Sequence, residues 1–212
     1  VPDRPRDTRL RRDTRAALGL SDDSFALLAV GNARPEKGFE DLLAAFARLG
    51  NRPGSSHAVC LVAGGLPDTA YVQGLQDSLR ASGLGDRFQL LGFRDDTHAL
   101  YSAADAFVLS SRSEGLPMVV LEAMMAGLPV VATRVGGVPA VLSDDCGLLC
   151  EPHDPESLAE AMRRLLEDGS LRQRLAEAAR QRAVKEYSVE RMADRYLSVY
   201  ARVVGARGRR RR

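Results

Sequence analysis

The chain has 212 residues and a formal net charge of +2 at pH 7, with 45% hydrophobic and 27% charged residues. This is ordinary globular composition, which excludes a collagen-like chain, a low-complexity tail and a coiled-coil rod. At about 100–200 residues per domain, the length predicts one domain with at most a small appendage, and a core that needs no disulfide or metal support.

The positive charge is concentrated at the two ends of the chain. Residues 1–15 hold six Arg and three Asp, residues 201–212 hold six Arg and no acidic residue, and the segment between them is mildly acidic. We expect the terminal run 207–212 to be a disordered, solvated tail, with nucleic acid or anionic lipid as the alternative partners of such a charge block. Basic residues without aromatic partners are weak support for nucleic-acid binding, which we do not expect.

The sequence gives no sign of a membrane span or a signal peptide. The longest weakly charged stretch, residues 115–133, contains a glutamate, two prolines and two glycines. The three cysteines, Cys60, Cys146 and Cys150, are odd in number and lack paired CxxC spacing, which predicts reduced thiols. We therefore expect the chain in the cytoplasm, with peripheral contact to the inner face of a membrane as an open alternative.

Short apolar runs alternate with segments of helical periodicity along the chain. Strands are predicted at residues 25–30, 58–63, 88–91, 105–109, 128–132 and 147–150. Helices are predicted at residues 38–49, 67–80, 96–103, 155–167, 171–187 and 189–204. This alternation predicts an α/β fold, a Rossmann-like parallel sheet with helices on both faces and a helical C-terminus. Ligands of such sheets bind beyond the carboxyl ends of the strands. The loops at that edge begin at Gly31, Gly64, Gly92, Ser110 and Thr133.

The loop after the first strand reads GNARPEKG over residues 31–38 and ends at the expected start of a helix. It is neither GxGxxG nor GxxxxGK[ST], so a dinucleotide site and a P-loop lose their main support. The free amides of a helix N-terminus beside Lys37 predict an anion site, to which Arg34 could add a second charge. Lys37 and Lys185 are the only lysines of the chain. The alternative is that Lys37 is an ordinary surface lysine.

A polar loop follows the fourth predicted strand and carries Glu114. A proline three residues later is typical of the first turn of a helix. The amides of Gly115 and Leu116 would then lie at a helix N-terminus beside this carboxylate. The carboxylate can accept hydrogen bonds from hydroxyl groups, whereas the amides suit an anion.

Glu122 is the only charged residue between Gly115 and Thr133, and its helix is apolar on nearly all sides. Such a helix should be largely buried, and a buried carboxylate needs partners. The structural alternative is a buried ion pair or a bond to an amide; the functional one is the binding of two ribose hydroxyls. Gly136 and Gly137, after the fifth strand, would let a ligand approach the backbone closely.

The remaining chemistry-bearing residues form no recognisable site. His57, His98 and His153 lie in no nucleophile–base arrangement, and no cluster has metal-ligand spacing. Cys146 and Cys150 are expected to pack in the core. We therefore predict no metal site and no cofactor.

The segments 31–38, 91–93, 105–111 and 114–137 occur in an order that resembles the C-terminal domain of glycosyltransferase family 4, retaining enzymes of the two-domain GT-B fold. The resemblance covers about residues 25–204. Its most specific part is the pattern of two glutamates separated by seven residues, with the second inside LEAM.

The resemblance implies a site for a nucleotide-sugar donor. Lys37 would bind the diphosphate, Glu114 the hydroxyls of the donor sugar with the amides of Gly115 and Leu116 nearby, and Glu122 the ribose. Lys37 and Glu114 would serve catalysis, in which cations and dipoles stabilise the leaving group. The acceptor would attack the sugar on the same face from which the leaving group departs, and no metal would take part. The implied donor-binding residues are Arg34, Lys37, Gly92, Phe93, Glu114, Gly115, Leu116 and Glu122, with the backbone near residues 91–93 at the base.

Two positions depart from the family pattern. The family often has Arg directly after the glycine of the first loop, where this chain has Asn32, so Arg34 could supply that charge instead. A glutamate usually follows the Gly-Gly segment at the place where this chain has Ala140, and no functional consequence of that change is predicted.

The GT-B fold needs an N-terminal Rossmann-like domain, which supplies the acceptor site. We therefore expect this chain to be the donor-binding half of a longer hexosyltransferase, able to bind nucleotide but not to transfer sugar alone. The expected parts are a linker or helix (1–24), a nucleotide-sugar-binding domain (25–187), a helix (188–204) that packs on this domain or on the N-terminal one, and a basic disordered tail (205–212).

Three other functions stay open. A non-catalytic nucleotide-binding module of the same fold is one, although the presence of Lys37, Glu114 and Glu122 argues against decay of the site. A sugar-nucleotide epimerase-like GT-B enzyme would need histidine and acidic groups placed for proton transfer. Nucleic-acid binding by the arginine tail would weaken steeply with salt. UDP, GDP and ADP fit the pattern equally.

Overall fold

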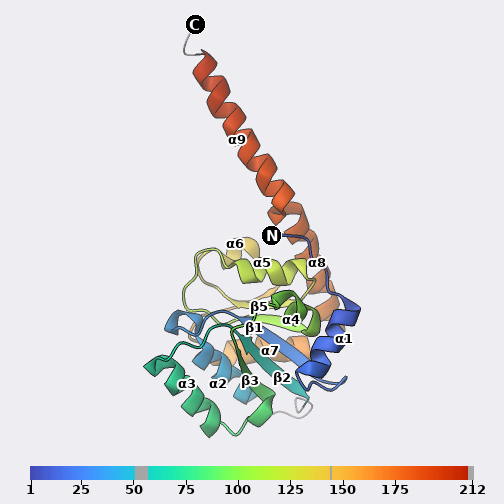
Figure 1. Cartoon of the computed structure of the whole chain (residues 1–212), viewed down its shortest axis with the longest axis vertical. Coiled ribbons are helices and arrows are strands. Elements are labelled where there is room, and N and C mark those ends of the chain that lie inside the picture. Colours follow the sequence, from blue (N-terminus) through green and yellow to red (C-terminus); the bar gives the residue numbers. More distant parts are fainter. Residues whose placement is uncertain (51–56, 144, 210–212) are drawn as a thin grey trace.

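The computed structural model describes residues 1–50, 57–143 and 145–209, and its centre is a six-stranded sheet in which every strand is parallel to its neighbours (Figure 1). The strands are β1 (Phe25–Val30), β2 (Ala58–Ala63), β3 (Phe88–Gly92), β4 (Ala106–Leu109), β5 (Val130–Thr133) and β6 (Leu148–Cys150). Their order across the sheet is β3-β2-β1-β4-β5-β6. This confirms the predicted Rossmann-like α/β fold, with the six predicted strands in place and their ends shifted by at most two residues.

Helices cover both faces of the sheet. They are α1 (Thr8–Ala17), α2 (Phe39–Gly50), α3 (Ala70–Ala81), α4 (Thr97–Ala103), α5 (Met118–Met125), α6 (Val138–Val141), α7 (Pro155–Glu167), α8 (Gly169–Tyr187) and α9 (Val189–Arg209). The ends of α7 agree with the prediction because Asp154 caps it, accepting from the amides of Glu156 and Ser157, and because Pro155 suits the first turn. The sequence did not predict α6, and it left α1 within a segment read as linker or helix.

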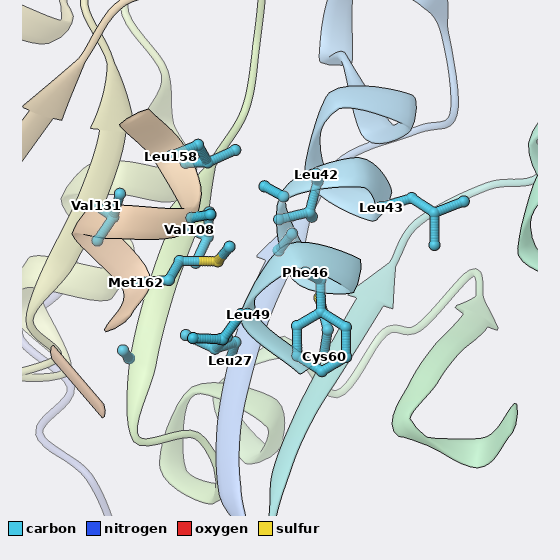
Figure 2. Packing of buried hydrophobic residues seen from close by; sticks show 14 of the residues in the cluster. Leu27, Leu42, Leu43, Phe46, Leu49, Cys60, Val108, Val131, Leu158 and Met162 are labelled. Carbon is cyan, nitrogen blue, oxygen red and sulfur yellow. The ribbon is translucent and has the colours of Figure 1, made fainter. Parts of the chain in front are cut away.

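The strands are buried on both faces, which explains their uninterrupted apolar runs. In β1, Leu27 packs on one face of the sheet and Leu28 on the other, and both are fully buried. Figure 2 shows the first face, where Phe46 of α2 and Met162 of α7 pack around Leu27. On the second face, α4 and α5 supply the covering side chains. Each such side chain contributes about 1.5–3 kcal/mol by leaving water.

The three cysteines are buried and free. Cys60 and Cys150 pack in the core of the first face and Cys146 in that of the second. Burial raises the pKa of the Cys60 thiol well above its ordinary value, and it raises that of Cys150 to about 12. Buried free thiols pack as small apolar groups, as predicted for Cys146 and Cys150.

Helix α1 is fixed to the amino end of the sheet by a buried arginine. Asp7 caps the helix by accepting from the Leu10 amide at 2.7 Å. Arg15, only 5% exposed, donates to Asp105 at 3.2 Å and to the carbonyl oxygen of Ser24 at 2.6 Å. Asp105 also accepts from the Ala26 amide at 2.8 Å. The carboxylate therefore joins α1, β1 and the start of β4.

Helix α9 projects away from the rest of the molecule (Figure 1), and its apolar residues are exposed. They include Met192, Tyr196, Leu197 and Tyr200. The sequence predicts that the apolar stripe of this helix packs either on this domain or on an N-terminal one. The first alternative is wrong, because the stripe is exposed here. The helix continues to Arg209, past the predicted end at residue 204, and residues 210–212 of the predicted tail lie outside the described part. Among the described residues, no helix is long and apolar enough to cross a membrane.

Candidate functional site

The strand order reverses between β1 and β4, so the loops that follow these two strands meet at the carboxyl edge of the sheet. The two loops are hydrogen-bonded to each other. Ser110 Oγ donates to the carbonyl oxygen of Lys37 at 2.9 Å, and the Arg112 amide donates to that of Glu36 at 2.8 Å. Gly38 has φ +58°, and a Cβ there would lie 2.4 Å from the Ser110 carbonyl oxygen. This close approach requires glycine.

The contact between the loops brings together two side chains that the sequence singled out. Lys37 Nζ lies 2.6 Å from Glu114 Oε1, and Ser111 Oγ donates to the same oxygen at 2.7 Å. The Lys37 side chain is 25% exposed and that of Glu114 is 11% exposed. Both of these bonds go to Oε1, and no described residue bonds Glu114 Oε2. Oε2 can therefore accept hydrogen bonds from hydroxyl groups, while the Lys37 ammonium keeps donors for an anion.

The loops after β2 and β3 are joined to the same edge through glycines. Gly64 has φ +151°, and a Cβ there would lie 1.9 Å from the Gly31 carbonyl oxygen. Its amide donates to Gly92 at 2.8 Å. The side chain of Asn32, the first departure from the family pattern, accepts from the Gly65 amide at 2.8 Å. Asn32 therefore has a structural task, which is to fix the loop after β2.

The glycines after β5 support Glu114 from the other side. A Cβ on Gly136, at φ +50°, would lie 1.9 Å from the Glu114 carbonyl oxygen, and the Gly137 amide donates to Gly115 at 2.7 Å. The close approach of a ligand to these glycines stays a prediction. Within the described residues, the backbone that lies against them is that of residues 114 and 115.

Gly115 and Leu116 lie directly before α5, which begins at Met118 with Pro117 as its cap residue. Both are exposed, and Leu116 and Met118 show half of their surface. The amides of residues 115 and 116 are thus just outside the first turn rather than within it. The site carries an exposed apolar rim beside the Lys37–Glu114 pair.

Glu122 lies apart from that pair, one turn into α5. Its Oε2 accepts a hydrogen bond from the Tyr101 hydroxyl at 2.9 Å, and it lines a cavity of about 210 Å³ with Thr97 and His98. Burial, followed by the charge of Glu122, raises the pKa of the Tyr101 hydroxyl far above its ordinary value, so the hydroxyl keeps its proton and donates it. The predicted need for a partner is confirmed. The partner is the Tyr101 hydroxyl, so the bond is neither an ion pair nor a bond to an amide.

The other predicted positions are exposed at the same edge. Arg34 is exposed, and its side chain makes no hydrogen bond or ion pair with any residue in the described part of the chain, although its carbonyl oxygen accepts from the Lys37 amide at 2.9 Å. Gly92 ends β3 with φ +71°, and the Phe93 ring after it is 77% exposed. An exposed aromatic ring at a ligand edge is suited to stacking on a flat partner.

The sequence patterns did not predict a role for Tyr101, Ser111 or Arg112. Each acts through a partner on another element or later in its loop, and no local motif signals such a pairing. No group of three or more His, Cys, Asp or Glu side chains within residues 1–50, 57–143 and 145–209 could hold a metal ion.

Comparisons with known proteins point to one family. The pattern of the family described as "Glycosyl transferases group 1" matches residues 11–182. The chain is 36% identical over 210 residues to D-inositol 3-phosphate glycosyltransferase of Saccharomonospora viridis, covering 92% of this chain and 47% of that protein. Sucrose-phosphate synthase from Thermosynechococcus elongatus shares its structure with a TM-score of 0.80 at 31% identity, over 92% of this chain and 49% of the other. HepE from Anabaena, solved in complex with UDP and glucose, has a TM-score of 0.86 at 25% identity, over 93% of this chain and 53% of the other. The chain spans about half the length of the curated relatives it matches.

Proposed function

The chain belongs to the group 1 glycosyltransferases, and we propose that it is the part of a retaining, family 4 hexosyltransferase that binds the nucleotide-sugar donor. The observation that carries this proposal is the Lys37–Glu114 pair at the point where the strand order reverses. A carboxylate with one free oxygen and a lysine with spare donors match the two halves of a donor, the hydroxyls of a sugar and the charge of a diphosphate.

In this proposal the Lys37 ammonium stabilises the departing diphosphate. The bond between the anomeric carbon and the phosphate oxygen breaks, and its electron pair leaves with the phosphate. A cation already in position stabilises that growing charge with little reorganisation. Glu114 Oε2 holds sugar hydroxyls, so the anomeric carbon stays in place while an acceptor hydroxyl attacks on the same face and its proton passes to the leaving phosphate oxygen. No metal is expected in this reaction.

Glu122 is proposed to bind the ribose of the donor. Its carboxylate is oriented by Tyr101 and faces a cavity, which suits a pair of neighbouring hydroxyls. The base would lie near Gly92 and Phe93, where a backbone turn and an exposed ring are available. Arg34, an exposed cation, would assist the diphosphate in place of the arginine that Asn32 replaces.

The acceptor site is proposed to lie on a second half of the protein. The relatives are about twice as long as this chain, which is consistent with an N-terminal domain of similar size. The exposed apolar stripe of α9 would pack on that domain. The chain alone should then bind donor and transfer no sugar.

Calorimetric titration of the purified chain with UDP, GDP and ADP tests this function. One nucleotide should bind, and Lys37→Ala should weaken it by about 10–100-fold, as expected for a lost hydrogen bond to a charged group. Lys185→Ala is the matched control because Lys185 is the one other lysine and is exposed on α8. Absence of binding by all three nucleotides, or an equal loss in both variants, would overturn the proposal.

A further inference from the structure

The loop that carries Glu114 is clamped to the start of α2 by one side chain, Arg112. Its Nε and Nη2 atoms bond the two carboxylate oxygens of Asp41 at 2.8 and 2.9 Å, and its Nη1 lies 2.5 Å from Glu40 Oε1. The Asp41 side chain is only 15% exposed. The hydrogen bond to Asp41 is the main cause that raises the pKa of the Arg112 guanidinium. A bidentate pair of this kind fixes direction as well as distance.

The main chain of the same loop is tied to the residues just before α2. The Arg112 amide donates to Glu36, and Ser110 Oγ donates to the carbonyl oxygen of Lys37. Two consecutive carbonyl groups of the first loop, those of residues 36 and 37, therefore accept bonds from the loop of Glu114. Within the described residues, Arg112 bonds neither Lys37 nor Glu114 directly.

We propose that Arg112 is a positioning residue, which holds the loop of Glu114 against α2 so that the Glu114 carboxylate and the Lys37 ammonium keep the separation that donor binding needs. The inference rests on the proposed function of this site. Its physical basis is that Arg112 is close in sequence to both members of the pair. Glu114 is two residues from Arg112, and Lys37 directly follows Glu36, whose carbonyl oxygen accepts from the Arg112 amide. Without the clamp, the bonds that remain between the loops are single and partly exposed.

A purely electrostatic role for Arg112 makes a different prediction. Arg112 also neutralises Glu40 and Asp41, two carboxylates that would otherwise repel an anionic donor. Asp41→Asn separates the two roles, since it weakens the bidentate clamp and at the same time removes a negative charge. An electrostatic role predicts tighter donor binding in this variant, whereas a positioning role predicts weaker binding.

The first test needs no ligand. Lys37 and Lys185 are the only lysines, so mass spectrometry after brief amine acetylation gives a clean ratio of their modification rates. In the wild-type chain Lys37 should be protected by its ion pair with Glu114 relative to exposed Lys185. The modification rate of Lys37 divided by that of Lys185 should rise in Arg112→Gln and in Asp41→Asn, toward the value of this ratio in Glu114→Gln. An unchanged ratio in both variants would overturn the inference even if no nucleotide binds.

The second test uses the nucleotide that binds in the titration above together with its glucose conjugate (UDP-glucose, GDP-glucose or ADP-glucose). The ratio of the two Kd values isolates the contribution of the sugar. Arg112→Gln and Asp41→Asn should each reduce that contribution by about tenfold, the size of a lost hydrogen bond to a carboxylate. Arg112→Lys, which keeps the charge and one bond, should restore part of it.

Arg163→Gln is the matched control, because Arg163 is an equally exposed arginine that pairs with two acids, Glu160 and Glu167, on α7. It should leave both ratios unchanged. Thermal melting checks that the variants fold, and Asp41→Asn, which keeps the side-chain shape, carries the test if Arg112→Gln does not. An Asp41→Asn chain that binds the sugar conjugate more tightly would overturn positioning in favour of electrostatics.

Discussion

Lys37 and Glu114 lie 77 positions apart in the sequence, yet their charged atoms meet at 2.6 Å above the carboxyl edge of the sheet. The fold produces this contact because β1 and β4 are adjacent while the strands that follow each of them lead away in opposite directions. The pair also depends on close backbone packing, since Gly38 touches Ser110 and Gly136 touches Glu114. The two charges therefore lie on loops that start from adjacent strands and pack closely against their neighbours.

The first prediction concerns Glu114→Gln. The amide keeps the size of the side chain but loses the negative charge. That charge pairs with the Lys37 ammonium and strengthens the hydrogen bond that the carboxylate accepts from a sugar hydroxyl. The affinity for the nucleotide-sugar should fall by about tenfold, while that for the free nucleotide should change little or rise, because Lys37 is released toward the diphosphate. Parallel calorimetric titrations measure both. An equal loss for the two ligands would show that Glu114 does not contact the sugar.

The second prediction concerns Glu122→Ala. Removal of a carboxylate that binds ribose hydroxyls should cost roughly 1.5–3 kcal/mol of nucleotide affinity, or about 10–100-fold in Kd. A 2′-deoxy nucleotide provides the sharper test, because it should bind more weakly than the ribonucleotide to the wild-type chain and equally to the variant. Tyr101→Phe should have a smaller effect, since it removes only the group that orients Glu122. A full preference for ribose in Glu122→Ala would exclude the ribose role.

The strands were predictable from sequence because burial on both faces leaves uninterrupted apolar runs, as in β1 and β2. Helix α7 was predictable to the residue because its cap and proline are local. Helix α1 was less predictable, since its polar sequence is stabilised by Arg15 and Asp105, which are 90 positions apart.

The sequence was enough to predict which residues belong to the candidate site, but not which of them contact one another. Motifs indicated Lys37, Glu114 and Glu122 individually. The pairing of Lys37 with Glu114, the bond from Tyr101 to Glu122 and the clamp between Arg112 and Asp41 all join residues that are 21 or more positions apart. Glycines were recognised as functional, but the backbone that each one contacts depends on which strands are neighbours.

The third prediction concerns the buried network at the amino end of the sheet. Asp105→Ala leaves Arg15, which is 5% exposed, without its carboxylate. Loss of one partner of a buried pair typically costs about 3–5 kcal/mol, and the carbonyl groups that also bond Arg15 should place this variant near the lower value. Urea unfolding measures it. Asp77→Ala, which removes an exposed pair with Arg80, is the control and should stay within about 0.5 kcal/mol of wild type. Similar losses in the two variants would contradict this account of Asp105.

The fourth prediction concerns pH. Burial, together with the charge and hydrogen bond of Glu122, raises the pKa of Tyr101 in the native state. The pKa of a tyrosine in the unfolded chain is about 10. The protonated form is therefore favoured by folding, and this contribution to stability is complete below about pH 10 and is lost as the pH rises toward the native pKa. Wild-type stability measured by urea unfolding should fall between about pH 9 and 11 more steeply than that of Tyr101→Phe. Parallel curves would mean that Tyr101 titrates normally in the native state.

The fifth prediction separates the conformation of Gly38 from its contact. Gly38 and Gly83 have nearly the same φ, +58° and +68°, but a Cβ on Gly38 would lie 2.4 Å from the Ser110 carbonyl oxygen, whereas one on Gly83 would meet nothing within 4 Å. Alanine at Gly83 should therefore cost only the left-handed conformation, about 1–2 kcal/mol, and leave nucleotide-sugar binding intact. Alanine at Gly38 carries that same cost and must also push the loop of Ser110 away from α2, which moves Glu114 relative to Lys37. Gly38→Ala should accordingly be the less stable of the two and should lose affinity for the sugar conjugate. Urea unfolding and calorimetry on the two variants decide the matter, and equal behaviour would mean that the contact between the loops does not hold the site together.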